Sequence, residues 1–517
     1  MQQRIVKWYN YLAYGMVDFL GAGSTALTSA WLLFFYTTFC GLTATQGALI
    51  FACARFVDAI ASPLMGIITD NFHKTKIGKR FGRRKFFILL GIPLVLSYML
   101  FWISGQSFFY YLVTYVTFDV VYTMVLVPYE TLASEMTQDY KKRTIFSGLR
   151  LFCGQVSAFF AAFIPGRLIA LLGKDNSLSF LYAAGIFAAV FVVILFFLYI
   201  FTWERPLAEI EAIQPVQSST PTKLSLGEKF HKIYVDLFST FKIRAFRVHI
   251  LMYLGCYISQ DIFSQVFTYF IVFALAYTAI TASNILSVIS IACIVGVVFG
   301  IFTISKFNPA VIYRLSILFF AVGVLGFLAA FLLPSVNQMW FLMASGFVSG
   351  IGRGALAYIP WNIYSFIPDV DELVTGQRRE GIFAGVMTFT RKATQAFAVF
   401  LVGILLDYSG FVAKASVQNP HAVQSIVVIM VVGVFFFLTL GTIASFNFKL
   451  SKESHALLLK QVAAYKKDTD YQMSPETAEI MKQLTGWDRE HLWGQNDVGF
   501  EARQAYRQTH LLKNSTK

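Results

Sequence analysis

Long apolar runs recur along the whole chain, and they constrain its fold more than any other feature. Each run has 18 residues or more, which is enough to cross the roughly 30 Å hydrocarbon layer of a membrane as a helix. The runs are continuous and do not alternate with polar residues, so a membrane β-barrel is excluded. We therefore predict an all-α membrane protein with twelve transmembrane helices. They are expected near residues 13–39, 46–68, 86–104, 107–127, 149–171, 179–202, 250–276, 282–304, 312–333, 339–361, 383–406 and 423–446.

The composition agrees with this class of protein. Of the 517 residues, 57% are apolar and 14% are charged, whereas soluble proteins carry about 25% charged residues. The formal net charge is +14, but the basic residues lie between the apolar runs. We interpret them as a topology signal, and no nucleic-acid partner is expected.

The basic residues alternate between successive connections. Residues 70–85 contain seven Lys and Arg, and later connections of the same set contain Lys141 and Arg379. The opposite connections hold chiefly Lys174 and Lys414. By the positive-inside rule, the basic loops are cytoplasmic. We expect a multi-pass protein of the cell inner (plasma) membrane, with both termini cytoplasmic and anionic membrane lipids as neighbours.

A polar segment at 204–249 divides the chain into two halves, 1–203 and 250–447, of six spans each. The halves repeat short motifs, such as Val127-Pro128-Tyr129 in the first and Ile359-Pro360-Trp361 in the second. A repeat of six spans is typical of transporters whose substrate site lies between the halves near the membrane midplane.

The segment 448–517 is polar and follows the last apolar run. Ser474 before Pro475 is typical of a helix start, and Gly486 of a helix end. We expect one or two cytoplasmic helices packed against the inner mouth. The segment has no recognisable arrangement of nucleophile, base and glycine loop. No enzyme activity and no cofactor are expected, and we predict a monomer.

Short motifs in both halves resemble those of a known family. They are Tyr14-Gly15, Asp18-Phe19, Ala54-Arg55, Asp58-Ala59, Gly82-Arg83-Arg84, Val127-Pro128-Tyr129, Arg378-Arg379-Glu380-Gly381 and Phe389-Thr390-Arg391-Lys392. In these motifs the chain resembles the glycoside-pentoside-hexuronide:cation symporters of the major facilitator superfamily. The resemblance implies the major facilitator fold, with two six-helix bundles, and sugar uptake driven by a cation gradient.

The resemblance also implies a cation site. Asp58, Thr123 and Lys392 match the family's positions, but Ser62 stands where melibiose-type members have a second carboxylate. Asp119 lies one helical turn before Thr123 on the same face. We expect it either to replace the missing carboxylate in part or to pair with a basic neighbour. A single carboxylate at this site favours H⁺ as the coupling ion, and Na⁺ at Asp58 stays open.

Charges near the middle of a span cost about 2.5 to 3.5 kcal/mol on insertion scales, so each is expected to face a cavity or a partner. Arg55 precedes Asp58 by three residues and shares its face. The two are expected to form an ion pair that fixes packing or takes part in cation handling. Lys392 is the expected counter-charge from the opposite half.

The expected substrate is a small-molecule sugar. Ala22 and Leu126 replace two sugar-binding acids of melibiose-type members, whereas Arg353 lies among glycines near the midplane. A guanidinium presents a planar fork to a carboxylate, so we favour an anionic sugar, a hexuronide or short uronic-acid oligosaccharide, over a neutral glycoside. Pairing of Arg353 with an acid such as Asp261 is the alternative. The candidate substrate-binding residues are Asp18, Arg353, Asp261, Gln265 and Arg150.

The basic cluster at 79–85, with Asp70 upstream, resembles the facilitator loop that latches the two bundles on the inner side, and Asp70, Arg83 and Arg84 are the candidate gating residues. The alternative is that these basic residues only signal topology. For the whole chain, we predict a symporter that works by alternating access and couples sugar import to H⁺ or Na⁺. The rival hypotheses are a lipid or lysolipid facilitator and a non-transporting membrane sensor that signals through its tail.

Overall fold

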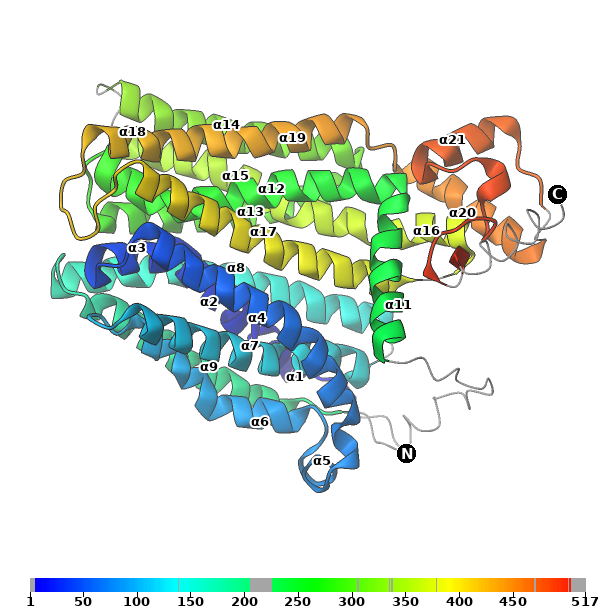
Figure 1. Cartoon of the computed structure of the whole chain (residues 1–517), viewed down its shortest axis with the longest axis horizontal. Coiled ribbons are helices and arrows are strands. Elements are labelled where there is room, and N and C mark those ends of the chain that lie inside the picture. Colours follow the sequence, from blue (N-terminus) through cyan, green and yellow to red (C-terminus); the bar gives the residue numbers. More distant parts are fainter. Residues whose placement is uncertain are drawn as a thin grey trace.

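The computed structural model describes residues 5–137, 139–204, 226–304, 306–333, 335, 338–377, 379–468, 471–500 and 502–503. These residues form helices joined by short loops and contain no β-strand. The long helices lie side by side as two bundles, one from each half of the chain (Figure 1).

The N-terminal bundle contains six helical rods. The first rod runs over Trp8–Cys40 and combines α1 (Trp8–Gly15), α2 (Ser24–Leu27) and α3 (Leu33–Phe35) with π-helical turns between and after them. The others are α4 (Ala44–Asn71), α6 (Lys85–Leu94) with its 3₁₀ extension to Trp102, α7 (Phe108–Met136), α8 (Tyr140–Leu172) and α9 (Leu178–Phe201).

The C-terminal bundle contains the corresponding six rods. They are α12 (Arg244–Tyr269), α13 (Ala279–Ile304), α14 (Pro309–Leu332), α15 (Met339–Tyr364), α17 (Glu380–Tyr408), and α18 (Pro420–Val428) continued by α19 (Val434–Phe446).

Eleven helical segments of the described residues are long and apolar enough to cross a membrane. The remaining rod, α12, carries Arg244, Arg247 and several polar residues, which lower its mean hydropathy. It nevertheless lies inside the C-terminal bundle against α15, α17 and α19. The predicted all-α membrane architecture is confirmed.

The helices extend beyond the apolar runs, because backbone hydrogen bonding continues where the chain leaves the hydrocarbon layer. The rod that includes α12 begins at Arg244 instead of 250, and α7 continues to Met136. The sequence signal for the start of α4 is confirmed. Thr43 caps α4 by accepting a hydrogen bond from the Gln46 backbone N–H at 3.1 Å, as the predicted capping box requires.

Short helices gather at one end of the molecule, which we call the basic end (Figure 1). They are α5 (Lys76–Phe81), α11 (Leu226–Ser239), α16 (Ile367–Thr375), α20 (Lys452–Lys467) and α21 (Pro475–Thr485). We call the opposite end the closed end, since hydrogen bonds join the two halves there. One example is the Ser283 hydroxyl on α13, which donates to the Ala162 carbonyl on α8 at 2.6 Å.

The described part of the tail after the last rod contains the helices α20 and α21, in agreement with the one or two helices predicted. Ser474 caps α21, and Gly486 ends it with a positive φ of 81°. The segment beyond α21 then crosses α16. The Trp493 backbone N–H donates to the Leu373 carbonyl at 2.9 Å, and the Asn496 side chain donates to the Val374 carbonyl at 2.6 Å.

Candidate functional site

A cavity of about 360 Å³ lies between the two halves. Its wall is largely polar on α12, where Tyr257, Gln260, Asp261 and Ser264 follow one another at helical spacing on one face. Helices of both halves contribute the rest of the lining. The polar and charged lining residues are Thr25, Ser29, Gln155, Tyr257, Gln260, Asp261, Ser264, Ser290, Arg353, Arg391 and Gln395.

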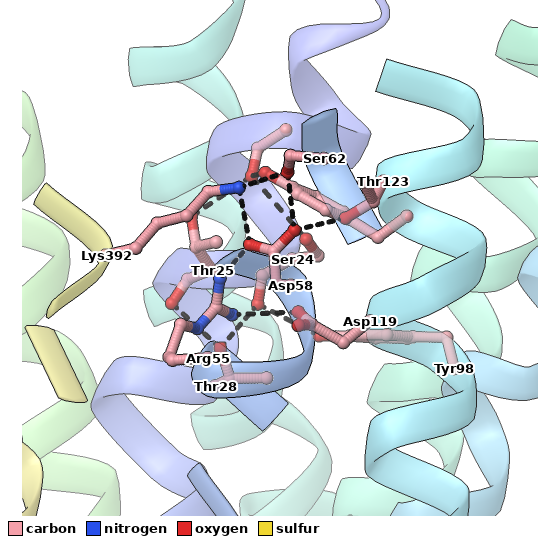
Figure 2. Close-up of polar contacts among 12 residues, drawn as sticks. Ser24, Thr25, Thr28, Arg55, Asp58, Ser62, Tyr98, Asp119, Thr123 and Lys392 are labelled. Atoms are coloured by element: carbon pink, nitrogen blue, oxygen red, sulfur yellow. Dashed lines mark hydrogen bonds and ion pairs between the residues drawn. The ribbon is translucent and has the colours of Figure 1, made fainter. Parts of the chain in front are cut away.

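Four charged side chains form a buried cluster, the charge quartet, of Arg55, Asp58, Asp119 and Lys392 (Figure 2). The guanidinium of Arg55 lies 3.5 Å from the carboxylate of Asp58 and 3.1 Å from that of Asp119. The Lys392 Nζ lies 2.7 Å from Asp58 Oδ2. Two cations and two anions cancel. Because Lys392 comes from α17 and the others from α4 and α7, the quartet joins the two halves.

Two hydroxyl groups complete the surroundings of Asp58. Ser62 donates to Asp58 Oδ1 at 3.0 Å, and the Thr123 hydroxyl also donates to this oxygen. Lys392 in turn donates to the Ser62 hydroxyl at 2.6 Å. Figure 2 shows Asp58 between Lys392 on one side and Thr123 on the other. Thr123 and Lys392, two residues predicted for the cation site with Asp58, thus both contact Asp58 directly.

Asp119 lies next to this group and shares Arg55 with Asp58 as an ion-pair partner. Its carboxylate is paired with Arg55, one of the two arrangements expected from the sequence. Arg55 therefore contacts both acids, as Figure 2 shows. The negative charge of Asp119 is balanced locally, which leaves Asp58 as the carboxylate that contacts Lys392.

Arg353 reaches the cavity from α15 among glycines. Its guanidinium donates to the Ser264 hydroxyl at 2.7 Å and lies 4.8 Å from the ring centroid of Phe263. In the part of the chain that the structure describes, no carboxylate forms an ion pair with Arg353.

Asp261 does not neutralise Arg353, because it is paired with another arginine. Arg391 donates to both carboxylate oxygens of Asp261, at 2.6 and 2.9 Å. The Arg391 guanidinium also lies 4.8 Å from the ring centroid of Tyr257, which fixes its plane. The expected alternative of an Asp261–Arg353 pair is therefore not what the geometry shows.

Three further substrate candidates are not among the described residues that line the cavity. Asp18 and Arg150 form an ion pair at 3.1 Å, and Arg150 also contacts Glu130 at 3.1 Å. Gln265, four residues after Asp261 on α12, is buried.

The predicted gating arginines contact two acids, Glu135 and Glu204. Both Arg83 and Arg84 form ion pairs with Glu135 at the end of α7. Glu204 accepts the backbone N–H groups of Arg83 at 3.0 Å and Arg84 at 2.8 Å, which fixes the loop before α6. The third predicted member, Asp70, has a side chain outside the described residues.

Sequence reasoning missed several residues of this region. Arg391 belongs to a family motif and is adjacent to Lys392, but no role in the cavity was predicted for it. The helical spacing of Gln260 and Ser264 with Asp261 was available as a signal. Gln155 and Gln395 carried no signal of their own, because uncharged amides are common in polar helix contacts.

The fold and the polar cavity between two six-helix bundles define a multi-pass membrane transporter. Residues 13–452 match the family described as MFS/sugar transport protein, and the chain belongs to this family. The predicted resemblance is therefore confirmed, and the relatives are transporters and not enzymes.

Two relatives illustrate the similarity. The isoprimeverose transporter of Lactiplantibacillus pentosus is 27% identical, over 82% of this chain and 85% of the relative. The glucuronide carrier protein homolog of Escherichia coli is 24% identical, over 82% of this chain and 89% of the relative. Among solved structures, a D-xylose-proton symporter superposes with a TM-score of 0.57 at 12% sequence identity. The superposition covers 83% of this chain and 97% of the symporter chain. This likeness confirms the predicted major facilitator fold.

Proposed function

We propose that this transporter imports an anionic sugar, a hexuronide or a short uronic-acid oligosaccharide, together with H⁺. The observation that carries the proposal is Arg353, a cavity arginine whose described contacts are a hydroxyl and aromatic rings instead of a carboxylate.

The charges around the cavity favour an anionic ligand. The charge quartet sums to zero, and Asp261 cancels Arg391. Arg353 remains as one positive charge. A buried charge without a partner is unfavourable, whereas a guanidinium and a carboxylate form a strong bidentate contact. The amides of Gln155, Gln260 and Gln395 offer donors and acceptors to sugar hydroxyls. The name of the E. coli relative, a glucuronide carrier homolog, agrees with this substrate class.

Proton coupling is favoured over Na⁺ coupling by the surroundings of Asp58. A Na⁺ site would draw on Asp58, Ser62 and Thr123, because Arg55 already holds the carboxylate of Asp119. One carboxylate and two hydroxyls are a sparse ligand set for Na⁺. Protonation of Asp58 would instead weaken its pairing with Lys392, and so would loosen one connection between the halves.

The proposal includes topology and mechanism. The protein spans the cell inner (plasma) membrane. Its basic end faces the cytoplasm, and its closed end faces outward. The transporter works by alternating access as a monomer, since one chain contains the whole cavity. Asp70, Arg83 and Arg84 belong to the inner gate.

Competition for uptake tests the substrate class. Uronides should displace a labelled uronide substrate better than the matching neutral glycosides, and Arg353→Gln should remove most of this preference. The loss of a desolvated charge-assisted contact corresponds to about tenfold or more in relative affinity. Arg314→Gln, on α14 against Phe446, is the matched control and should keep the preference. Equal competition by neutral sugars in the unmodified protein would contradict the anionic assignment.

A further inference from the structure

A carboxylate of one half caps a helix of the other half at the closed end. Asp407 is the penultimate residue of α17, and its two oxygens accept the backbone N–H groups of the first two residues of α4. Ala44 donates to Oδ1 at 2.9 Å, and Thr45 donates to Oδ2 at 2.7 Å. The first four N–H groups of a helix have no partner within it. The Thr43 hydroxyl accepts the N–H of Gln46, and Asp407 accepts two of the remaining N–H groups of α4.

The helices approach closely enough for this contact because of a glycine. Gly403 lies one turn before Asp407 on α17. A side chain there would place its Cβ 2.5 Å from the Ala48 Cβ and 2.7 Å from the Ala44 carbonyl oxygen. The two backbones are therefore in direct contact at this point, and even a short aspartate reaches the start of α4.

The position of Asp407 is unfavourable within its own helix. An acidic residue at a helix C-terminus faces the negative end of the helix dipole, whereas an acidic residue at an N-terminus is stabilised. Asp407 occupies the C-terminal turn of α17 and the N-terminal side of α4 at once. Its charge is therefore stabilised by the contact between the halves and destabilised when that contact opens.

We propose that Asp407 is a positioning residue of the transport cycle, which holds the closed end shut by capping α4 and must release it before this end opens. The proposal rests on the alternating access proposed above, but not on the substrate or the coupling ion. Other contacts of the closed end, such as that of the Lys414 N–H with the Thr37 carbonyl at 3.0 Å, stay intact when Asp407 is changed.

Distances between the halves test this proposal in the full chain without any sugar. Spin labels at Gln106 and Leu333, exposed residues in closed-end loops of the two halves, report opening by double electron–electron resonance, after replacement of the native cysteines. Asp407→Asn and Asp407→Ala should raise the ratio of the open population, which has long distances between the labels, to the closed population by roughly tenfold. This is the size of effect typical for a charged helix cap.

A second variant removes a donor instead of the acceptor. Thr45→Pro deletes the N–H that binds Asp407 Oδ2 at a first-turn position where proline is tolerated, and it should shift the population in the same direction by a smaller factor. Asp175→Asn, an equal change of charge in an exposed closed-end loop, should leave the distances unchanged. Thermal melting of each variant shows whether it is folded.

The proposal is overturned if folded Asp407→Asn or Thr45→Pro has the distance distribution of the unmodified protein. It is also overturned if Asp407→Asn lowers the melting temperature without changing that distribution, since a cap that stabilises both states equally is only structural. Neither result bears on the uronide preference, which is measured by competition.

Discussion

Asp58 receives hydrogen bonds or ion pairs from four residues on three helices. They are Lys392 on α17, Thr123 on α7, and Ser62 and Arg55 on α4. Lys392 is the member from the other half of the chain. A change in the charge of Asp58 is therefore felt directly at the contact between the halves, which is the requirement for coupling an ion to a conformational change.

Replacement of this carboxylate should separate coupling from exchange. In Asp58→Asn, the side chain keeps its shape but has no titrating proton, so uphill accumulation should be lost while exchange of preloaded substrate continues. Both activities are measured in proteoliposomes. Asp119→Asn is the comparison, because Asp119 is paired with Arg55, and it should retain some accumulation. Full accumulation by Asp58→Asn would remove Asp58 from the coupling mechanism.

The sequence predicted contacts between residues close in the chain better than contacts between distant ones. Arg55 and Asp58, three residues apart, were predicted from helical spacing and form an ion pair at 3.5 Å. The pairing of Lys392 with Asp58 was expected only because both positions match a family motif. The pair of Asp261 with Arg391 was not predicted, since the partners are 130 positions apart and only the packing of α12 against α17 brings them together.

At the scale of elements, the segment after α21 is attached to α16 through backbone carbonyls. Asn496 is buried, and its amide donates to the carbonyls of Val374 at 2.6 Å and His491 at 2.7 Å. Lys466 adds an ion pair to Glu372 at 2.6 Å. The tail is thus a structural part of the basic end of the C-terminal half.

Asn496→Ala should destabilise this attachment. It removes the hydrogen bonds of the side chain to the Val374 carbonyl, which keeps the Gly494 N–H as a donor, and to the His491 carbonyl, at a cost of about 1 kcal/mol each. We expect a lower melting temperature and easier proteolysis of the tail. Gln495→Ala changes the exposed neighbouring side chain and should leave both unchanged. Equal melting temperatures for the two variants would show that Asn496 does not anchor the tail.

The ends of helices were predictable where a local rule applies, as at Thr43, Ser474 and Gly486. The π-helical turns of the first rod, such as Phe19–Gly23, were not, because an i to i+5 hydrogen bond follows from the packing of neighbouring helices and leaves no composition signal. The partners of Arg83 were missed for a similar reason, because Glu135 at the end of α7 and Glu204 after α9 are distant from it in the sequence.

At the scale of the whole molecule, the two halves are joined at the closed end and in the charge quartet. Toward the basic end, rods of the N-terminal half such as α6 and α9 lean away from the C-terminal half (Figure 1). Hydropathy and the polar segment at 204–249 predicted two halves of six spans, and the family resemblance implied that these form two bundles. They could not predict which residues join the bundles, since those contacts involve Ser283, Asp407 and backbone groups without a periodic signal.

Ion-driven accumulation in proteoliposomes tests the central claim, that this chain is a proton-coupled sugar symporter. A labelled glucuronide is offered outside vesicles whose interior is more alkaline, with and without a protonophore, and with a Na⁺ gradient in place of the H⁺ gradient. We predict accumulation above the outside concentration under the H⁺ gradient and its collapse with the protonophore. Accumulation that requires Na⁺ would contradict proton coupling, and the absence of accumulation of both uronides and neutral glycosides under either gradient would contradict the symporter itself.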